Sequence, residues 1–388
     1  MKKLIILATL FHTILLLGYK IISIYYPLFL EKNHFSYILI GENYLFIYFS
    51  VAIFSLILDK LINVENSPMM YLCFSFLGYA IYDIGMIITK TKALFLLWQI
   101  ELGFSSALFY LVSRAILMRI KGMEKTSGFV YFYSAPIYGS FLAAIIGGYV
   151  MTYKGFYPLF LTSFFTFMVG IAITGTIYKK RLIYFEKVHV ERNIIRSAKQ
   201  FLKRCEKKYI FLIFVSLIYV GFIRAFFAIF LQKIGFSYSQ IMDFVVANSG
   251  LSIFVSIIIA KVVKKMNNKS AIVIGTLIAS FFFSLFQIMS LDKFLLCVLL
   301  FLFYNTGYLF VNSGKSGLIG EVIDNKEDAA TIDTIIVSLE VAITAFIIGL
   351  LKSVFLSFKE IYSGIGLFCF LTALLFLIFD MPFSSRVF

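Results

Sequence analysis

The stretch FLEKNHFSYILIGE (residues 29–42) recurs 201 residues later as FLQKIGFSYSQIMD (residues 230–243). Phe, Leu, Lys, Ser, Tyr and Ile recur at matching places, and the acidic Glu42 is matched by the acidic Asp243. Both copies follow one long apolar run and begin the next, so they occupy the same place in each half. Internal similarity of this kind indicates a duplicated structural unit. The sequence therefore predicts two halves with the same order of helices.

Long apolar runs fill both halves. The 388 residues are 61% hydrophobic and 14% charged, whereas a soluble domain carries about 25% charged residues. A membrane-spanning helix needs about 20 mostly apolar residues, and β-barrel strands of roughly ten would alternate instead. We therefore expect an all-α integral membrane protein with twelve transmembrane helices. Their approximate ranges are 4–30, 37–62, 68–89, 93–118, 127–152, 156–178, 209–232, 240–264, 270–290, 294–318, 329–353 and 361–380.

The longest polar stretch, residues 179–208, separates the first six runs from the last six and contains eleven Lys or Arg. This division predicts an N-terminal six-helix bundle at 1–178, a basic cytoplasmic linker at 179–208 and a C-terminal six-helix bundle at 209–388. Anionic headgroups attract each nearby cation by about 1 kcal/mol, so the basic face of the linker is expected to lie against membrane lipids. Alternatively, the linker only sets the topology.

The distribution of charge predicts the orientation in the membrane. The formal net charge is +15, a value also seen in nucleic-acid-binding proteins, but its location matters more here than its sum. With the amino terminus inside, and with residues at the ends of spans counted in the adjoining loops, cytoplasmic segments hold 23 Lys and Arg, external loops hold 8 and span interiors hold four. The positive-inside rule then places both termini in the cytoplasm. The run after Met1 continues to about Leu30 without a small-residue cleavage site, so we expect a first span.

Signatures of enzyme chemistry are missing from the sequence. The four cysteines form no CxxC pair and the three histidines are scattered, which predicts neither a disulfide framework nor a metal site. No Gly-x-x-x-x-Gly-Lys-Ser/Thr stretch is present, so no nucleotide-binding loop is recognised. We therefore expect no catalytic residue, no cofactor and no nucleic-acid partner.

Two six-helix units joined by a long basic cytoplasmic loop, with both termini inside, resemble the major facilitator superfamily over essentially the whole chain. At the end of its second span that family usually shows Gly-x-x-x-Asp-Arg/Lys-x-Gly-Arg, and this chain has Ser55-x-x-x-Asp59-Lys60. The resemblance implies that Asp59 takes part in gating on the cytoplasmic side; capping of a helix end is the alternative. Many members carry an Arg four residues before a Gly in the fourth span, where this chain has Gln99 before Gly103.

The fifth span carries a second similarity to that family. Its antiporter motif, Gly-x-x-x-Gly-Pro-x-x-Gly-Gly, is similar to the stretch Gly139-x-x-x-Ala143-Ala144-x-x-Gly147-Gly148, in which the central pair is replaced. Without the Pro the stretch is weak evidence for antiport. Small residues on one helical face also let a neighbouring helix approach closely, and we favour this packing role.

Ionisable residues inside the spans are the main candidates for function. Each costs roughly 2.5 to 3.5 kcal/mol at the bilayer centre and therefore needs a partner or water. The resemblance implies that the first, fourth, seventh and tenth helices line a central cavity. Five of these residues fall in those helices, and among the third, sixth, ninth and twelfth helices, which the resemblance implies are peripheral, only the third carries such a residue in its interior, Asp83. The five are Lys20, Glu101, Arg114, Arg224 and Lys315.

Helical spacing then suggests roles for individual residues. The predicted substrate-binding residues are Lys20, Arg224, Lys315, Tyr304, Tyr308 and Asn312. The predicted proton-coupling or ion-pairing residues are Glu101, Arg114, Glu340 and Asp333, with Glu101 as the first candidate for carrying a proton and Glu340 as the next. Glu42 and Asp243 are predicted to gate the outer mouth of the cavity. Alternatively, they only lie in the water among the lipid headgroups.

These features favour a secondary active transporter that moves a small organic solute by alternating access, coupled to protons or another ion. The excess of basic over acidic groups in the cavity helices favours an anionic solute. The alternatives are a multidrug exporter of lipophilic compounds and a flippase for lipid-linked saccharides; a membrane transferase or a scaffold fits less well. We expect a multi-pass protein of the cell membrane, a monomer, whose partners are lipids, a small-molecule substrate and the coupling ion.

Overall fold

The computed structural model describes residues 2–61, 68–89, 91–118, 126–179, 193–263, 265–354 and 356–380. Within these residues, twelve helical stretches are long and apolar enough to cross a membrane, so the predicted fold class is confirmed. The helices of the first half are α1 (Lys2–Ser23), α2 (Tyr26–Lys32), α3 (Tyr37–Leu61), α4 (Pro68–Ile88), α5 (Lys92–Met118), α6 (Thr126–Lys154) and α7 (Phe156–Lys179). Those that follow are α8 (Ile194–Arg204), α9 (Lys207–Ala225), α10 (Phe227–Lys233), α11 (Tyr238–Val263), α12 (Asn268–Ser284), η1 (Leu285–Ile288), η2 (Leu291–Lys293), α13 (Phe294–Val322), α14 (Lys326–Val354) and α15 (Phe358–Asp380).

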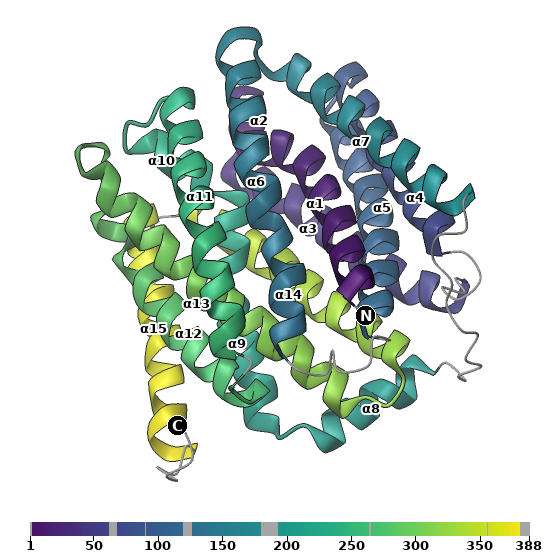
Figure 1. Ribbon diagram of the computed structural model, residues 1–388. Coiled ribbons are helices and arrows are strands. Elements are labelled where there is room, and N and C mark those ends of the chain that lie inside the picture. The colour runs from purple at the N-terminus through teal and green to yellow at the C-terminus, as the bar shows by residue number, and fades with distance from the viewer. Residues whose placement is uncertain are drawn as a thin grey trace.

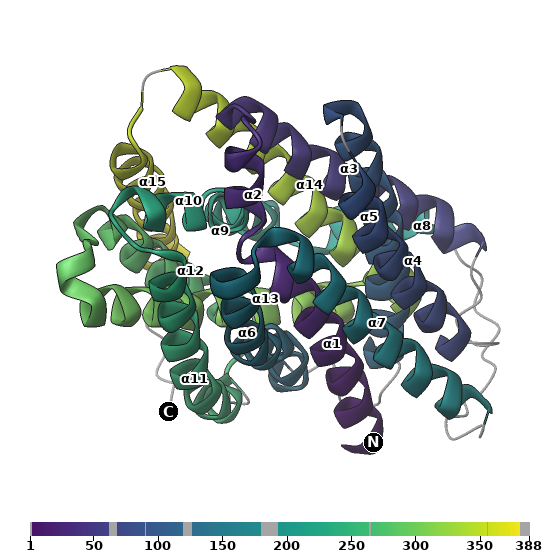
Figure 2. The ribbon, with the colours of Figure 1, turned by 90° about the horizontal axis from the view of Figure 1, so that it is seen from above.

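The two halves of the chain form two bundles that lie side by side (Figure 2). At their border α3 packs along α14, and α6 packs along α11. The short helices α2 and α10 lie at one end of the molecule, whereas α8 and both ends of the described chain lie toward the other (Figure 1). Large apolar side chains such as Phe254 and Phe165 are 69% and 64% exposed, as expected for surfaces that face lipid.

The repeated stretch forms the same order of helices and turns in both halves. Helices α2 and α10 begin and end 201 residues apart, and α3 and α11 begin at the equivalent Tyr37 and Tyr238. The turns between them contain the left-handed residues His34 (φ 59°) and Gly235 (φ 103°), also 201 residues apart. Both turns thus reverse the chain in the same way, which supports duplication of a six-helix unit.

The first span is broken rather than continuous, as its single apolar run had suggested. Helix α1 ends at Ser23 and α2 begins at Tyr26, with Pro27 in the first turn of α2. Proline has no backbone N–H, so it cannot donate to the carbonyl of Ser23 four residues earlier, and its ring crowds that carbonyl. The break places Ser23 at a helix end beside the interior of the protein.

Small residues let helices approach closely where the fold requires it. A Cβ atom on Gly139 of α6 would lie 3.0 Å from the carbonyl carbon of Leu16 in α1, and one on Gly147 would lie 3.1 Å from the carbonyl oxygen of Ile21. Both distances are tighter than ordinary packing. The small-residue face of α6 is therefore the surface on which α1 packs.

Candidate functional site

A cavity of about 250 Å³ lies between the two bundles. Its described lining comes from α1, α3, α5 and α6 on one side and from α9, α11 and α13 on the other, with contributions from α2 and α10. Helices α4, α7, α12 and α15 contribute none of the described lining residues. The cavity thus draws on both halves of the chain, as a site that responds to their relative movement must.

The cavity contains two cations, one from each half. Lys20 of α1 and Arg224 of α9 both line it, and no Asp or Glu is among its described lining residues. The Arg224 guanidinium lies over the ring of Tyr48 in α3, 5.0 Å from the centroid, and donates a hydrogen bond to the Tyr48 hydroxyl. The remaining polar lining is rich in phenols, from Tyr19, Tyr44, Tyr48, Tyr110, Tyr133, Tyr304 and Tyr308.

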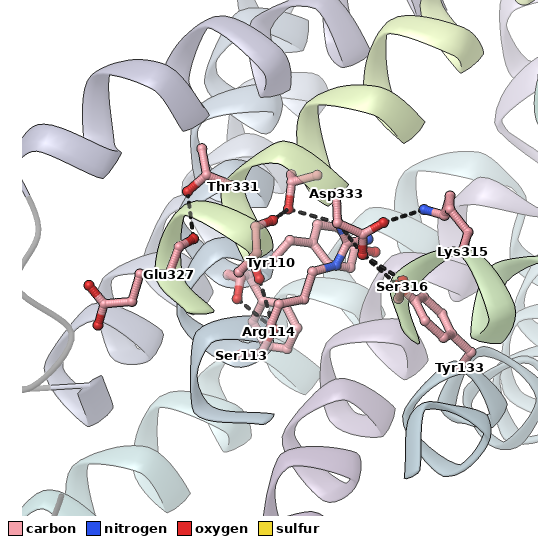
Figure 3. A network of polar contacts seen from close by, with 12 residues as sticks. Tyr110, Ser113, Arg114, Tyr133, Lys315, Ser316, Glu327, Thr331 and Asp333 are labelled. Atoms are coloured by element: carbon pink, nitrogen blue, oxygen red, sulfur yellow. Dashed lines mark hydrogen bonds and ion pairs between the residues drawn. The ribbon is translucent and has the colours of Figure 1, made fainter. Parts of the chain in front are cut away.

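An ion-pair cluster joins the two bundles near the start of α14, the helix that also contacts α8; Figure 3 shows its side chains. Asp333 of α14 is fully buried and lies between two cations, Arg114 of α5 and Lys315 of α13. The Arg114 Nη1 atom is 3.4 Å from Asp333 Oδ2, and Lys315 Nζ donates to the other oxygen. Because Arg114 belongs to the first half and Asp333 to the second, the pair connects the bundles.

Hydroxyl groups complete this Asp333 cluster. Ser316 and Tyr133 donate to Asp333 Oδ2 at 2.7 Å and 3.0 Å, and their own oxygens are 2.7 Å apart. Arg114 also donates to the Thr334 hydroxyl at 2.8 Å. A buried carboxylate with this many donors is well compensated for the loss of water. The cluster is thus suited to hold the two bundles together while the α8 side is closed.

The sequence matches the model of the Major Facilitator Superfamily over residues 8–339. This chain belongs to the major facilitator superfamily. Its fold is similar to a solved D-xylose-proton symporter, with a TM-score of 0.69, 15% identity and coverage of 99% of both chains. It is also similar to the nucleoside transporter NupG, with a TM-score of 0.68, 13% identity and coverage of 98% of this chain and 100% of that one. No curated protein matches the sequence.

In this superfamily transporter, the predicted substrate-binding residues separate into two groups. Lys20, Arg224, Tyr304 and Tyr308 line the cavity. Asn312 is buried and donates its side-chain amide to the Tyr308 carbonyl oxygen at 3.2 Å, and Lys315 is engaged by Asp333. Neither of these two is among the described lining residues.

The two predicted proton carriers lie in different surroundings. Glu101 lines a groove on the outside of the first bundle together with lipid-facing side chains such as Phe74 and Leu77, and it accepts a hydrogen bond from Ser105 at 2.8 Å. Glu340 is 5% exposed, and neither of its carboxylate oxygens has a hydrogen-bond partner in the described part of the chain. Glu340 is thus buried without a described partner and Glu101 lies at the outer groove, and the proton-carrying role of both stays a prediction.

The predicted gating residues also differ in their contacts. Asp59 is buried at the α8 end of α3 and accepts a hydrogen bond of 2.6 Å from Thr331 of α14, which joins the two bundles. Glu42 is half-buried and Asp243 is exposed, and neither is among the described residues that line the cavity. Asp59 thus lies at the border between the bundles, and the gating role of the other pair stays a prediction.

Sequence reasoning missed two residues that matter for the site. Tyr48 contacts Arg224 across the bundles, and Tyr133 joins the Asp333 cluster. Tyr44 and Tyr48 are four residues apart, on one face of α3, and both line the cavity, so helical spacing was the signal that pointed to Tyr48. Tyr133 has no such companion, and its role depends on the neighbouring α13 and α14.

Proposed function

We propose that this protein is a secondary active transporter that moves a small organic anion across the cell membrane by alternating access, coupled to protons. The observation that supports it is the pair of cavity cations, Lys20 and Arg224, in a lining whose described residues include no carboxylate. Two half-buried cations without a counter-ion among the described lining residues are unfavourable, and an anionic ligand would relieve that cost. Phenol hydroxyls around them would donate to oxygen atoms of the same ligand.

The positions of the two cations suggest how binding drives the movement. Lys20 belongs to the half at residues 1–178 and Arg224 to the half at 209–388, so an anion held by both would draw the bundles together. Arg224 is held by Tyr48 of the opposite half. The substrate would replace that contact, and the bundles would then rock around it as the Asp333 cluster opens.

Coupling to protons and membrane orientation are further parts of the proposal. Glu340, buried and without a described hydrogen-bond partner, supports a proton-binding role in the second half, because an unpaired carboxylate is costly in such surroundings. The excess of Lys and Arg in segments on the α8 side supports cytoplasmic termini. The α8 side of the cavity would accordingly be its cytoplasmic side, and the protein would act as a monomer.

The test is thermal unfolding of the purified protein with anionic, cationic and neutral solutes of similar size. A ligand at 100 times its dissociation constant stabilises by about 2.7 kcal/mol, so we expect a raised Tm with one class of organic anion. Replacing Arg224 or Lys20 by Gln should abolish the increase. Replacing the exposed Lys359 by Gln, which removes the same charge outside the cavity, should leave it unchanged.

The same panel separates the other transport functions. A multidrug exporter of lipophilic cations would be stabilised by cations, and a flippase for lipid-linked saccharides would respond to none of the soluble solutes. Either pattern, or an anion response that survives in both the Arg224→Gln and Lys20→Gln variants, would overturn the proposal.

A further inference from the structure

Asp83 of α4 carries a carboxyl group that is neither among the described lining residues of the central cavity nor part of the Asp333 cluster. Its side chain has no exposed surface, and neither of its carboxylate oxygens has a hydrogen-bond partner among the described residues. A buried carboxylate without a partner costs several kcal/mol, whereas the protonated acid costs much less. We propose that Asp83 holds a proton and exchanges it with the central cavity through one water molecule and Ser23. This inference rests on proton-coupled transport as proposed above.

The space beside Asp83 has the size of one water molecule. A pocket of about 10 Å³ adjoins the carboxyl group, and Ser23 and Tyr19 are among its lining residues. A cavity needs roughly 10 to 15 Å³ to hold a water, together with polar partners. Asp83 and Ser23 would supply those partners, because the Ser23 hydroxyl also has no hydrogen-bond partner in the described chain.

Ser23 connects this pocket to the transport cavity. Ser23 and Tyr19 line both the small pocket and the 250 Å³ cavity that contains Lys20 and Arg224. Ser23 is the last residue of α1, at the break before Pro27. The helix break therefore places a free hydroxyl between an isolated acid and the substrate site.

The other polar groups around the pocket are mostly engaged or uncharged. The titratable groups that face it are the phenols of Tyr19, Tyr26, Tyr79 and Tyr82, and no Lys, Arg or second carboxylate is among its described lining residues. Three hydroxyls are already hydrogen-bonded: Tyr26 to Asn43 Oδ1 at 3.2 Å, Tyr79 with Ser106 Oγ at 2.6 Å, and Ser163 to the Gly18 carbonyl oxygen at 3.0 Å. With no cation beside it, Asp83 gains little from being ionised while the pocket is closed.

The proton transfer balances without another reactant. When water from the central cavity reaches the pocket, the Asp83 O–H bond breaks and its proton forms hydronium with that water. The Ser23 hydroxyl accepts a proton on its oxygen and releases its own toward the cavity, leaving an Asp83 carboxylate that binds a proton again, by the reverse steps, when the cavity has opened to the other side of the membrane. One proton moving with one singly charged anion carries no net charge, so a gradient of one pH unit would drive about tenfold accumulation.

The experiment compares two kinds of transport in proteoliposomes, using the anion that raises the Tm of the wild-type protein. Exchange of labelled for unlabelled anion needs no net proton movement, whereas accumulation driven by a pH gradient does. Asp83→Asn should keep exchange within about threefold of wild type and lose the roughly tenfold accumulation per pH unit. Ser23→Ala should slow accumulation but not exchange, and Ser23→Thr, which keeps the hydroxyl, should restore it.

Two results would overturn the inference. One is wild-type accumulation by the Asp83→Asn variant; the other is equal loss of exchange and accumulation in a variant whose Tm is unchanged, which would indicate a purely structural role. If Asp83→Asn does not fold, the Ser23→Ala and Ser23→Thr pair gives the same decision, since equal accumulation by both variants would exclude the relay.

A separate measurement keeps this inference distinct from the proposed function. The infrared difference spectrum between wild type and Asp83→Asn should contain the C=O stretching band of a protonated carboxyl group at neutral pH, whatever the substrate is. A carboxylate band in its place would refute the protonated Asp83. If the wild type transports no organic anion, the proposed function fails while this spectrum still decides the protonation of Asp83.

Discussion

Replacing Asp333 by Asn is expected to open the α8 side of the transporter. Asp333 is the anion between Arg114 and Lys315, and the three side chains are at most 5% exposed. Removing one partner from a buried ion pair costs about 3 to 5 kcal/mol, because the remaining charge stays buried without compensation. Arg114 can escape this cost only if the bundles separate and let water reach it.

We expect the equilibrium between open and closed molecules to shift by about 3 kcal/mol, the lower end of this 3 to 5 kcal/mol range. Lys315 and Asp333 lie in the same half, so much of their interaction persists when the bundles part, and only the Arg114 contribution is specific to the closed state. A shift of about 3 kcal/mol corresponds to roughly a 100-fold change in the ratio of open to closed molecules. A population of about 1% open would therefore become about equal numbers of open and closed molecules.

Distances between spin labels at the α8 side measure this shift. Lys60 and Lys261 are exposed, lie at the ends of α3 and α11 and are equivalent in the internal repeat, so each replaced by a labelled Cys reports on one bundle. The exposed Asp324 provides the matched control, since Asp324→Asn removes the same charge from the turn before α14 without emptying a buried site. Its distance distribution should match that of wild type.

A double variant tests whether buried Arg114 is the cause. Arg114→Met combined with Asp333→Asn removes the stranded cation, so the open population should fall back toward that of wild type. An Asp333→Asn protein with wild-type distances would refute the reasoning. So would a double variant that is as open as Asp333→Asn alone, because the cost would then come from elsewhere in the cluster.

Three further predictions follow from other contacts. Gly139→Leu should destabilise the protein by about 1 to 3 kcal/mol in denaturant or thermal unfolding, because α1 must move away from α6; an unchanged Tm would contradict the packing. Lys233→Met removes an ion pair with Glu31 at 3.2 Å that is partly exposed, so the free-energy difference between the open and closed states on the α2 side should change by no more than about 1 kcal/mol, read from label distances; a larger shift would contradict this. The hydrogen bond from Arg204 lowers the pKa of Asp324 below its ordinary 3.8, so this exposed contact should persist above pH 4 and weaken only as pH falls through that lowered pKa, seen as a modest increase in mobility of a label at the end of α8; an increase near neutral pH would refute it.

The spans could be predicted because each depends on a local run of apolar residues. Two of the helices that were missed, α2 and α8, also had local signals. Pro27 marks the break that separates α2 from α1. In the linker, Asn193 caps α8 by accepting from the Arg196 backbone N–H at 3.0 Å, and Ser197 and Phe201, one turn apart, form its buried face. Neither signal concerns hydrophobicity, so a search for apolar runs passes over both.

The position of Glu101 shows where assignment by helix alone fails. Its helix α5 does contribute to the cavity, but through Tyr110. Nine residues separate the two positions, which corresponds to a rotation of about 180° at 3.6 residues per turn. A residue opposite Tyr110 must face the outside of the bundle, and Glu101 lines the outer groove there. The helical rotation was available from sequence once one cavity-facing residue of α5 was known.

For Lys315 the opposite holds. The sequence placed it on the correct side of α13, but it could not show how far along the helix axis the residue lies from the cavity. It lies seven residues after Tyr308, nearly two turns, so both point to the same side of α13 about 10 Å apart along its axis. Tyr308 reaches the cavity, whereas Lys315 reaches the level at which Asp333 and Arg114 close the gap between the bundles. No pattern within one helix encodes where the opposite bundle makes contact, because that contact moves during transport. When the α8 side opens, Asp333 stays beside Lys315 in the same half, so Lys315 keeps its partner, whereas Arg114 of the opposite half loses its own.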